Sequence, residues 1–310
     1  MSAECFSKLE LNLTEWEQSM ALDMELSGFG QDWVFRGQAK DWSLEPSLRR
    51  ARQAAGYSDC LDPERRVITH FRERAHLLDP LLAEDVGNLE WAARIQHYGG
   101  PTRLLDFVSS FWVAAFFAME LNSSGNLPDK PVVWAVNGRK LYQAAKRKLC
   151  TMDRWPEVAD EMTHDAHAFD DSYHSDRMRA ARWVCGQSIW GDARQPRPER
   201  WQLPMVLHVE SGRTDERIVA QGGCFICPLD ADRPFEDCLF GTFPELTRLG
   251  EPEDYEPGRG MLERCVIVKV CLPSGPRKAL EVLERMNITA AALFPGMHGL
   301  ARSQHNNLIR

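Results

Sequence analysis

The apolar run from Phe111 to Leu121 constrains the fold more than any other feature of this sequence. It follows Ser109-Ser110, and because serine is a preferred N-cap residue, we expect a helix to begin there. The run is apolar on all sides of such a helix, and a helix of that kind is buried. It is too short to span a bilayer, which takes about 20 residues. We therefore predict a central, buried helix and no membrane partner.

Hydrophobic periodicity and turn residues predict the other elements. Helices are expected over residues 62–78, 88–98 and 276–286, and strands over residues 32–36, 132–136, 205–209, 218–225 and 264–271. Because helices and strands do not alternate regularly, the predicted fold class is α+β, with helices packed on a small β-sheet that could be split. We expect one domain over residues 1–310. Within it, the charge blocks of residues 139–203 predict a charged helical insertion or a peripheral lobe.

Charge and cysteine content limit the classes of function. The net charge is −8, which argues against a surface that coats duplex DNA, although a local basic groove remains open. Nine cysteines without a repeating spacing fit a reducing compartment, and the first residues do not resemble a signal peptide. These features predict a cytoplasmic protein.

Phe35-Arg36-Gly37 stands at the end of the first predicted strand. The guanidinium fork of arginine suits bidentate contact with phosphate or carboxylate, and glycine allows a ligand to approach closely. The alternative is an arginine that ties the strand end to a carboxylate of the protein. The motif alone leaves both interpretations open.

The second candidate segment runs from Gln96 to Asp106, between a predicted helix and the buried helix. It places His97, Tyr98, Thr102 and Arg103 within a few residues of Asp106. Polar groups beside a buried helix must be paired, because leaving them unpaired costs several kcal/mol. Arg103 and Asp106 could therefore pair with each other while His97 bonds a backbone carbonyl. The density of polar groups favours a functional site.

These segments resemble the FRG-domain family, which is named for its Phe-Arg-Gly motif. The resemblance is carried, in the family's order and over nearly the whole chain, by residues 35–38, 42–48, 96–107, 217–225 and 293–301. Gly100 and Phe107 stand where Leu and Trp are more usual in the family. The resemblance implies that the whole chain is one FRG-type domain.

A second resemblance, to ADP-ribosyltransferases of the Arg-Ser-Glu type, implies an activity. Those enzymes place an arginine, often followed by glycine, at the end of their first core strand, and that arginine binds NAD. The resemblance implies a related fold and NAD as the substrate. The implied catalytic residues are Arg36, His97, Arg103, Asp106 and Gln221. The implied NAD-binding residues are Phe35, Arg36, Gly37, Gln38, Tyr98, Thr102 and Arg103.

The sequence departs from the transferases at the catalytic acid. They carry a glutamate two residues after a Gln or Glu, whereas here Gln221 is followed by Gly222-Gly223. Asp106, Glu216 or Glu64 would have to serve instead.

The resulting hypothesis is an NAD-dependent ADP-ribosyltransferase-like toxin or effector that modifies a macromolecule, either nucleic acid or protein. A neutralising antitoxin partner and a role in phage defence follow from the resemblance. The alternative is a non-catalytic nucleotide- or nucleic-acid-binding module, with basic clusters at 139–148 and 177–200. A third interpretation is that the signature is only a folding core.

No metal site is predicted. Cys224 and Cys227 form a lone Cys-x-x-Cys, which we interpret as two core cysteines. His164, His167 and His174 lie among acidic residues without a diagnostic spacing, so a solvated surface is expected there.

Overall fold

A computed structural model of the protein describes residues 7–28, 32–78, 87–120, 128–151, 174–190, 202–211, 216–244, 253–254, 256–257, 262 and 265–307. Its strands are β1 (Ser7–Asn12), β2 (Trp33–Gln38), β3 (Leu105–Val108), β4 (Val132–Asn137), β5 (Val206–Val209), β6 (Gly223–Pro228), β7 (Glu253–Asp254) and β8 (Cys265–Cys271). The first helices are α1 (Gln18–Leu26), α2 (Ser47–Ala55), α3 (Leu61–Ala75), α4 (Asn88–His97), α5 (Phe111–Met119) and α6 (Gly138–Cys150). The later helices are α8 (His174–Trp190), α9 (Glu216–Gln221), α10 (Phe235–Thr242), α11 (Pro276–Arg285), α12 (Ala290–Leu293) and α13 (Met297–Asn307).

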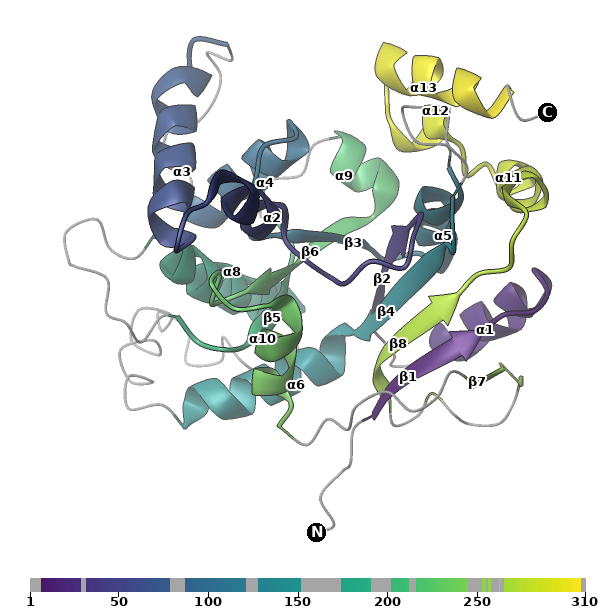
Figure 1. Ribbon diagram of the computed structural model, residues 1–310, viewed down its shortest axis with the longest axis horizontal. Helices are drawn as coiled ribbons and strands as arrows, with labels where there is room; N and C mark the ends of the chain where they lie inside the picture. Colours follow the sequence, from purple (N-terminus) through teal and green to yellow (C-terminus); the bar gives the residue numbers. More distant parts are fainter. Residues whose placement is uncertain are drawn as a thin grey trace.

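The strands of the described residues form one mixed sheet in the order β5-β6-β3-β2-β4-β8-β1-β7 (Figure 1). β1 pairs in parallel with β7 and β8, and the other neighbours are antiparallel. Helices cover both faces, with α5 and α11 in the core on one side and α6 and α10 on the other. The predicted mixture of helices packed on a sheet is confirmed.

The sheet is continuous but very narrow at one join. Phe35 and Val108 are the only residues that pair between β2 and β3, whereas β2 pairs with β4 along its whole length. Beyond Phe35 and Val108 the two strands diverge. The sheet is therefore not split, although a single pair of residues joins its two parts.

The buried central helix is confirmed as α5. The hydroxyl of Ser110 accepts a hydrogen bond from the backbone N–H of Val113, as an N-cap should. Every residue of α5 except Phe117 is buried. The helix packs on β2 and β4, and α11 covers its other side. Burying a helix that is apolar on all sides requires this enclosure.

The strand predicted over residues 218–225 is wrong in its first half. Residues Glu216–Gln221 form helix α9, and the strand begins only at Gly223. A short apolar run such as Ile218-Val219-Ala220 cannot distinguish helix from strand by periodicity. Gly222, at φ +60°, makes the turn between the two elements, a conformation that L side chains rarely adopt.

The charged region of residues 139–203 is described in part. Helix α6 buries Leu141, Tyr142, Ala145 and Leu149, and α8 packs against α4 and β5. These two helices therefore contribute to the same core as the sheet. His164 and His167 lie outside the described residues. Cys224 and Cys227 are both buried on β6, one in each of two core clusters, so they are core cysteines as predicted.

Two kinds of feature are absent from the part of the chain that the structure describes. It contains no group of three or more His, Cys, Asp or Glu side chains that could hold a metal ion. It also contains no helix that is both long enough and apolar enough to cross a membrane.

At Gly37, β2 approaches the backbone of α5 closely. A Cβ atom at this position would overlap the backbone carbonyl of Ala114 and press on the backbone nitrogen of Ala118. Because both neighbours belong to the backbone of a buried helix, neither can rotate away. Only glycine fits between this strand and this helix.

Replacing Gly37 by alanine should lower the free energy of unfolding by about 3 kcal/mol through overpacking. Denaturant titration would measure the loss. The matched control is Gly186→Ala in α8, where an added Cβ meets nothing within 4 Å. That change should be neutral, or stabilising by up to about 1 kcal/mol. A Gly37→Ala variant within about 0.5 kcal/mol of the parent would contradict the packing argument.

Candidate functional site

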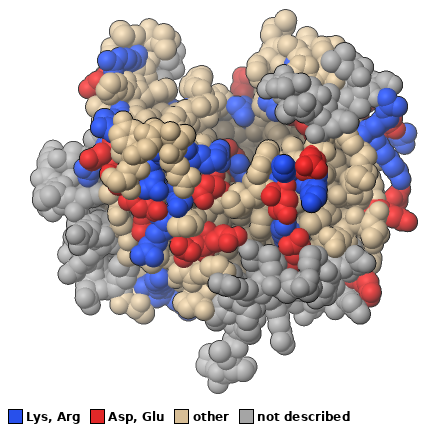
Figure 2. Space-filling model, viewed as in Figure 1, with Lys and Arg blue, Asp and Glu red and all other residues tan. Residues whose placement is uncertain are grey.

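A cavity of about 270 Å³ opens beside the narrow join of the sheet. It is lined by residues of β2, α4, β3, α5, α9, β6 and α13, together with Phe294 after α12. In the space-filling view, the surface is hollowed between the lobe that carries α3 and the lobe that carries α12 and α13 (Figure 2). The lining residues that carry polar groups or rings are Phe35, Arg36, Gln96, His97, Asp106, Phe107, Phe117, Arg217, Gln221, Cys224, Phe225, Phe294 and Arg302.

Arg36 lies on β2, where that strand diverges from β3. Its Nη1 donates a hydrogen bond of 2.8 Å to the backbone carbonyl of Asp106, so the side chain bridges the gap between the strands. The buried Nε of Arg36 has no hydrogen-bond partner among the described residues. Burial lowers the pKa of the guanidinium, and nearby Arg50 adds to this effect while Asp106 opposes it. A half-buried cation with an unsatisfied donor favours an anionic ligand.

Asp106 supplies a carboxylate to the same cavity. Its Oδ2 accepts a hydrogen bond of 2.9 Å from Nε2 of Gln96 and lies 3.9 Å from Nη1 of Arg36. Gln96 is itself fixed, because its Nε2 also donates to the carbonyl of Leu104 and its Oε1 accepts from the hydroxyl of Thr102. The Asp106 side chain remains 60% exposed. It is therefore held in place and still accessible to a ligand.

The opposite wall comes from the C-terminal part of the chain. The guanidinium carbons of Arg217 and Arg302 lie 4.9 Å and 4.0 Å from the centre of the Phe294 ring. Two hydrogen bonds, of 2.7 Å and 2.6 Å, join Arg302 to the carboxylate of Glu120 and so attach α13 to the end of α5. The charge of Arg302 is thus matched by Glu120. Arg217 is a second guanidinium group on the same wall.

Gln221 and His97 also line the cavity. Nε2 of Gln221 donates a hydrogen bond of 2.9 Å to the carbonyl of Leu293, which ties α9 to the segment that carries Phe294. The backbone carbonyl of His97 accepts a bond of 3.4 Å from Arg217. The ends of α4 and α9 are therefore joined across the cavity.

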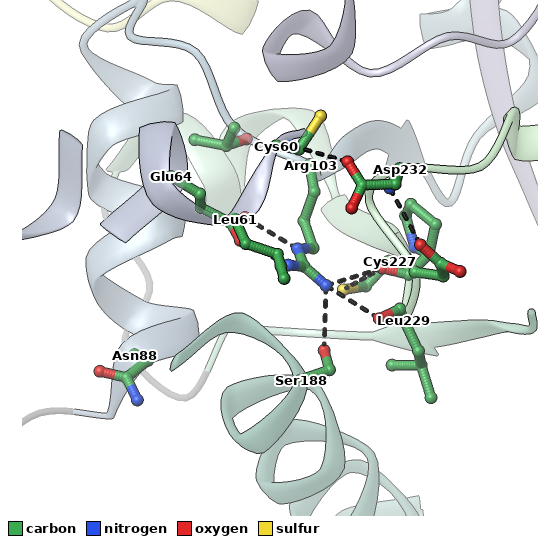
Figure 3. A network of polar contacts seen from close by, with 12 residues as sticks. Cys60, Leu61, Glu64, Asn88, Arg103, Ser188, Cys227, Leu229 and Asp232 are labelled. Carbon is green, nitrogen blue, oxygen red and sulfur yellow. Dashed lines mark hydrogen bonds and ion pairs between the residues drawn. The ribbon is translucent and has the colours of Figure 1, made fainter. Parts of the chain in front are cut away.

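Arg103 lies elsewhere, in a buried network of its own (Figure 3). Its side chain is fully buried and forms an ion pair with Glu64 of α3. It also donates to the hydroxyl of Ser188 and to the carbonyls of Pro228 and Leu229. Burial lowers the pKa of Arg103, but the charge and the hydrogen bond of Glu64, with smaller effects of Cys227 and Cys185, together raise it above its ordinary value. This guanidinium does not face the cavity, and Asp106 interacts with Arg36 rather than with Arg103.

The structure brings together some of the predicted site residues and separates others. Phe35, Arg36, Gly37, His97, Asp106 and Gln221 line the cavity. Gln38, Tyr98, Thr102 and Arg103 do not line it, and neither do Glu64 and Glu216. Gln38 accepts from the Trp134 indole, and Thr102 is buried behind Gln96. Of the three proposed acids, Asp106 alone lines this cavity.

Sequence reasoning did not assign roles to Arg217, Phe294 and Arg302. Arg217 and Phe294 belong to segments that resemble the FRG family, so their membership in those motifs was an available signal. Arg302 follows the last motif and carries no local signal. Its position depends on the pairing of α13 with Glu120, which only the folded structure shows.

Comparison with known proteins adds one result. Residues 31–126 match the FRG domain, so the match includes both the Phe35-Arg36-Gly37 strand and the segment from Gln96 to Asp106. No curated protein and no solved structure gives a significant match.

The arrangement is suited to binding an anion that has a planar, ring-bearing part. Three guanidinium groups and one exposed carboxylate surround the cavity, and phenylalanine rings form parts of its wall. Arginine provides directional donors for phosphate oxygens, and the rings provide apolar contact area. A nucleotide has both kinds of group.

The Arg103–Glu64 pair should be essential for stability. Glu64→Gln leaves the buried guanidinium without its counter-ion, so the free energy of unfolding should fall by about 3–5 kcal/mol. The matched control is Glu73→Gln, which removes the exposed partner of Arg74 and should cost less than about 1 kcal/mol. Denaturant titration would measure the free energy of unfolding of both variants. An equal decrease for the two would contradict this assignment.

Proposed function

We propose that the cavity binds NAD and that the protein transfers ADP-ribose to a macromolecule. The observation that carries this proposal is the convergence of Arg36, Asp106 and Gln221 on one cavity from three separate segments. The ADP-ribosyltransferases that the chain resembles place this arginine on their first core strand, and their Gln or Glu stands at the position of Gln221. Here Arg36 lies on the second strand, β2. Arg36 and Gln221 line the same space although they are far apart in the sequence.

The cavity residues fit the chemical groups of NAD. The cavity of about 270 Å³ is close to the lower end of ligand sites, which begin near 300 Å³, so it suits one half of a dinucleotide. Arg36 and Arg217 can bind the pyrophosphate between the halves. The ring of Phe294 can contact a planar nicotinamide or adenine ring.

Asp106 is the group we assign to the reacting sugar. In the transfer, the bond between the ribose carbon and the nicotinamide nitrogen breaks, and its electron pair leaves with neutral nicotinamide. The ribose passes through a cation-like state, which a fixed carboxylate stabilises. The acceptor atom then bonds to the ribose carbon and loses a proton, which the same carboxylate can accept.

This assignment replaces the glutamate that the transferases carry. Gly223 stands at the position of that glutamate and also lines the cavity. Asp106 approaches from β3, the strand that pairs with β6 at this point. The carboxylate is therefore supplied by the neighbouring strand.

The biological setting that we propose is a toxin or effector in the cytoplasm, controlled by a neutralising protein and acting in phage defence. An FRG-type domain that spans the whole chain is part of this proposal. A non-catalytic nucleotide-binding module is the second candidate, and the absent glutamate favours it.

NAD should stabilise the protein against heat. A ligand at a concentration ten times its Kd adds about 1.4 kcal/mol to the free energy of unfolding, and this raises the Tm by roughly 2–4 °C. Arg36→Ala should abolish the shift, because it removes a guanidinium that would bind the pyrophosphate. Arg285→Ala, which removes an exposed arginine on α11, should keep it. If millimolar NAD leaves the Tm of the parent protein unchanged, the NAD proposal fails.

Asp106→Asn separates the two candidate functions. It should retain most of the thermal shift with NAD, while release of nicotinamide falls by at least about a hundredfold because the cation-like sugar loses its counter-charge. Expression in cells should be toxic for the parent protein and not for this variant. An NAD shift without nicotinamide release in the parent protein would instead establish the binding module.

A further inference from the structure

A group of arginine and aromatic side chains lies beside the cavity on α3 and α4. We call it the arginine–aromatic patch, and it consists of Phe71, Arg72, Trp91, Arg94 and Tyr98. The guanidinium carbons of Arg72 and Arg94 lie 5.7 Å and 5.2 Å from the centre of the Trp91 ring. Phe71 contacts Trp91 edge-on and stacks on Tyr98, with ring centres 6.4 Å apart.

The two guanidinium groups of the patch pair with a ring and not with acids. Within the described part of the chain, neither Arg72 nor Arg94 forms a salt bridge or a side-chain hydrogen bond, and Nη1 of Arg94 is buried without a partner. By contrast, Arg49, Arg52 and Arg74 each pair with a carboxylate. A guanidinium stacked on a ring keeps its N–H donors at its edge, where they can bind phosphate oxygens.

Tyr98 adds an exposed aromatic surface. It caps the C-terminus of α4 and is 75% exposed, although its ring is held by Phe71 on one side and by His97 edge-on. An exposed ring held in one orientation offers a face on which a nucleobase can stack. No hydrogen-bond partner in the described structure explains the position of this side chain.

The patch is continuous with the cavity. His97 touches Tyr98 and lines the cavity, and Gln96, the residue before it, holds Asp106. Gln96 and His97, which line the cavity, lie between Arg94 and Tyr98 in the sequence. A polymer bound across Arg94 and Tyr98 would therefore lie at the mouth of the cavity.

The surrounding charge supports a polyanion at this place. Helices α2, α3 and α4 carry eight arginines and four acidic residues, although the whole chain has a net charge of −8. Three of these arginines, Arg49, Arg52 and Arg74, pair with carboxylates, and one of the acids, Glu64, is neutralised by Arg103. Figure 2 shows basic atoms over α2 and α3. On the predicted basic cluster at 139–148, by contrast, Lys140 and Lys148 donate to backbone carbonyls and so serve the fold.

We propose that the arginine–aromatic patch binds single-stranded nucleic acid and presents it to the cavity as the acceptor of ADP-ribose. The role as acceptor rests on the proposed function, whereas binding to the patch does not. Arg72 and Arg94 contact backbone phosphates, and Tyr98 stacks on an unpaired base. The bases of a duplex are already stacked, so a single strand fits this surface better than a duplex.

Fluorescence anisotropy with a labelled twelve-nucleotide single strand, as DNA and as RNA, tests the binding site without NAD. The parent protein should bind at low salt and lose affinity as salt rises. Arg72→Ala with Arg94→Ala should weaken binding at least tenfold. It should also reduce the slope of the logarithm of affinity against the logarithm of salt concentration by about 1.4, because each phosphate contact on a single strand contributes about 0.7.

Two control variants make the test specific. Arg277→Ala with Arg285→Ala removes two exposed arginines from α11, which lies on the opposite side of the molecule from α3 in Figure 1. This double variant should bind the single strand with unchanged affinity. Tyr98→Phe keeps the ring and should bind like the parent, whereas Tyr98→Ala should bind at least fivefold more weakly. Thermal melts verify that all variants are folded.

The outcomes are separable from those of the NAD experiment. The patch assignment is wrong if the labelled single strand does not bind at low salt, or if the α11 control loses as much affinity as the patch variant. It is also wrong if an acidic peptide binds to the patch in place of the nucleic acid. If the strand binds through the patch but no labelled ADP-ribose is transferred to it from NAD, the acceptor role is overturned and the binding site stands. If NAD itself causes no thermal shift, the proposed function fails independently of the patch.

Discussion

The contact between β2 and α5 at Gly37 is the constraint on which the rest of the site depends. A helix that is apolar on all sides must be enclosed, and here a strand approaches so closely that no side chain fits between them. This contact fixes β2 on one side. On the other side β2 meets β3 at a single residue pair and then diverges from it. The divergence leaves the space into which Arg36 projects.

Two arginines of the FRG-like segments illustrate how burial determines role. Arg103 is fully enclosed, and a carboxylate, a hydroxyl and two carbonyls use its donors. Arg36 is 21% exposed and donates a hydrogen bond to the backbone carbonyl of Asp106 on β3. Its Nε has no partner among the described residues. A guanidinium whose donors are all used stabilises the fold, whereas one with a remaining donor beside a cavity can bind a ligand.

The cavity and the arginine–aromatic patch form one continuous surface centred on the end of α4. That helix places Gln96 and His97 in the cavity and Arg94 and Tyr98 on the patch. The proposed dinucleotide site and the proposed acceptor site are therefore positioned by the same rigid element. A short, well-packed helix suits this task, because small errors in placing two substrates cost large factors in rate.

The sequence by itself determined the buried helix, the strand that carries Arg36 and the helix that ends at the Gln96-His97 segment. It did so because periodicity, capping residues and glycine stops are local signals. It could not determine which of the two arginines faces a ligand, because the partner of Arg103 is Glu64, which lies on α3, 39 residues earlier in the chain. It also left Arg217, Phe294 and Arg302 without roles. Only the tertiary structure brings these distant segments to one cavity, since their contacts depend on the packing of α5, α9 and α13 around the sheet.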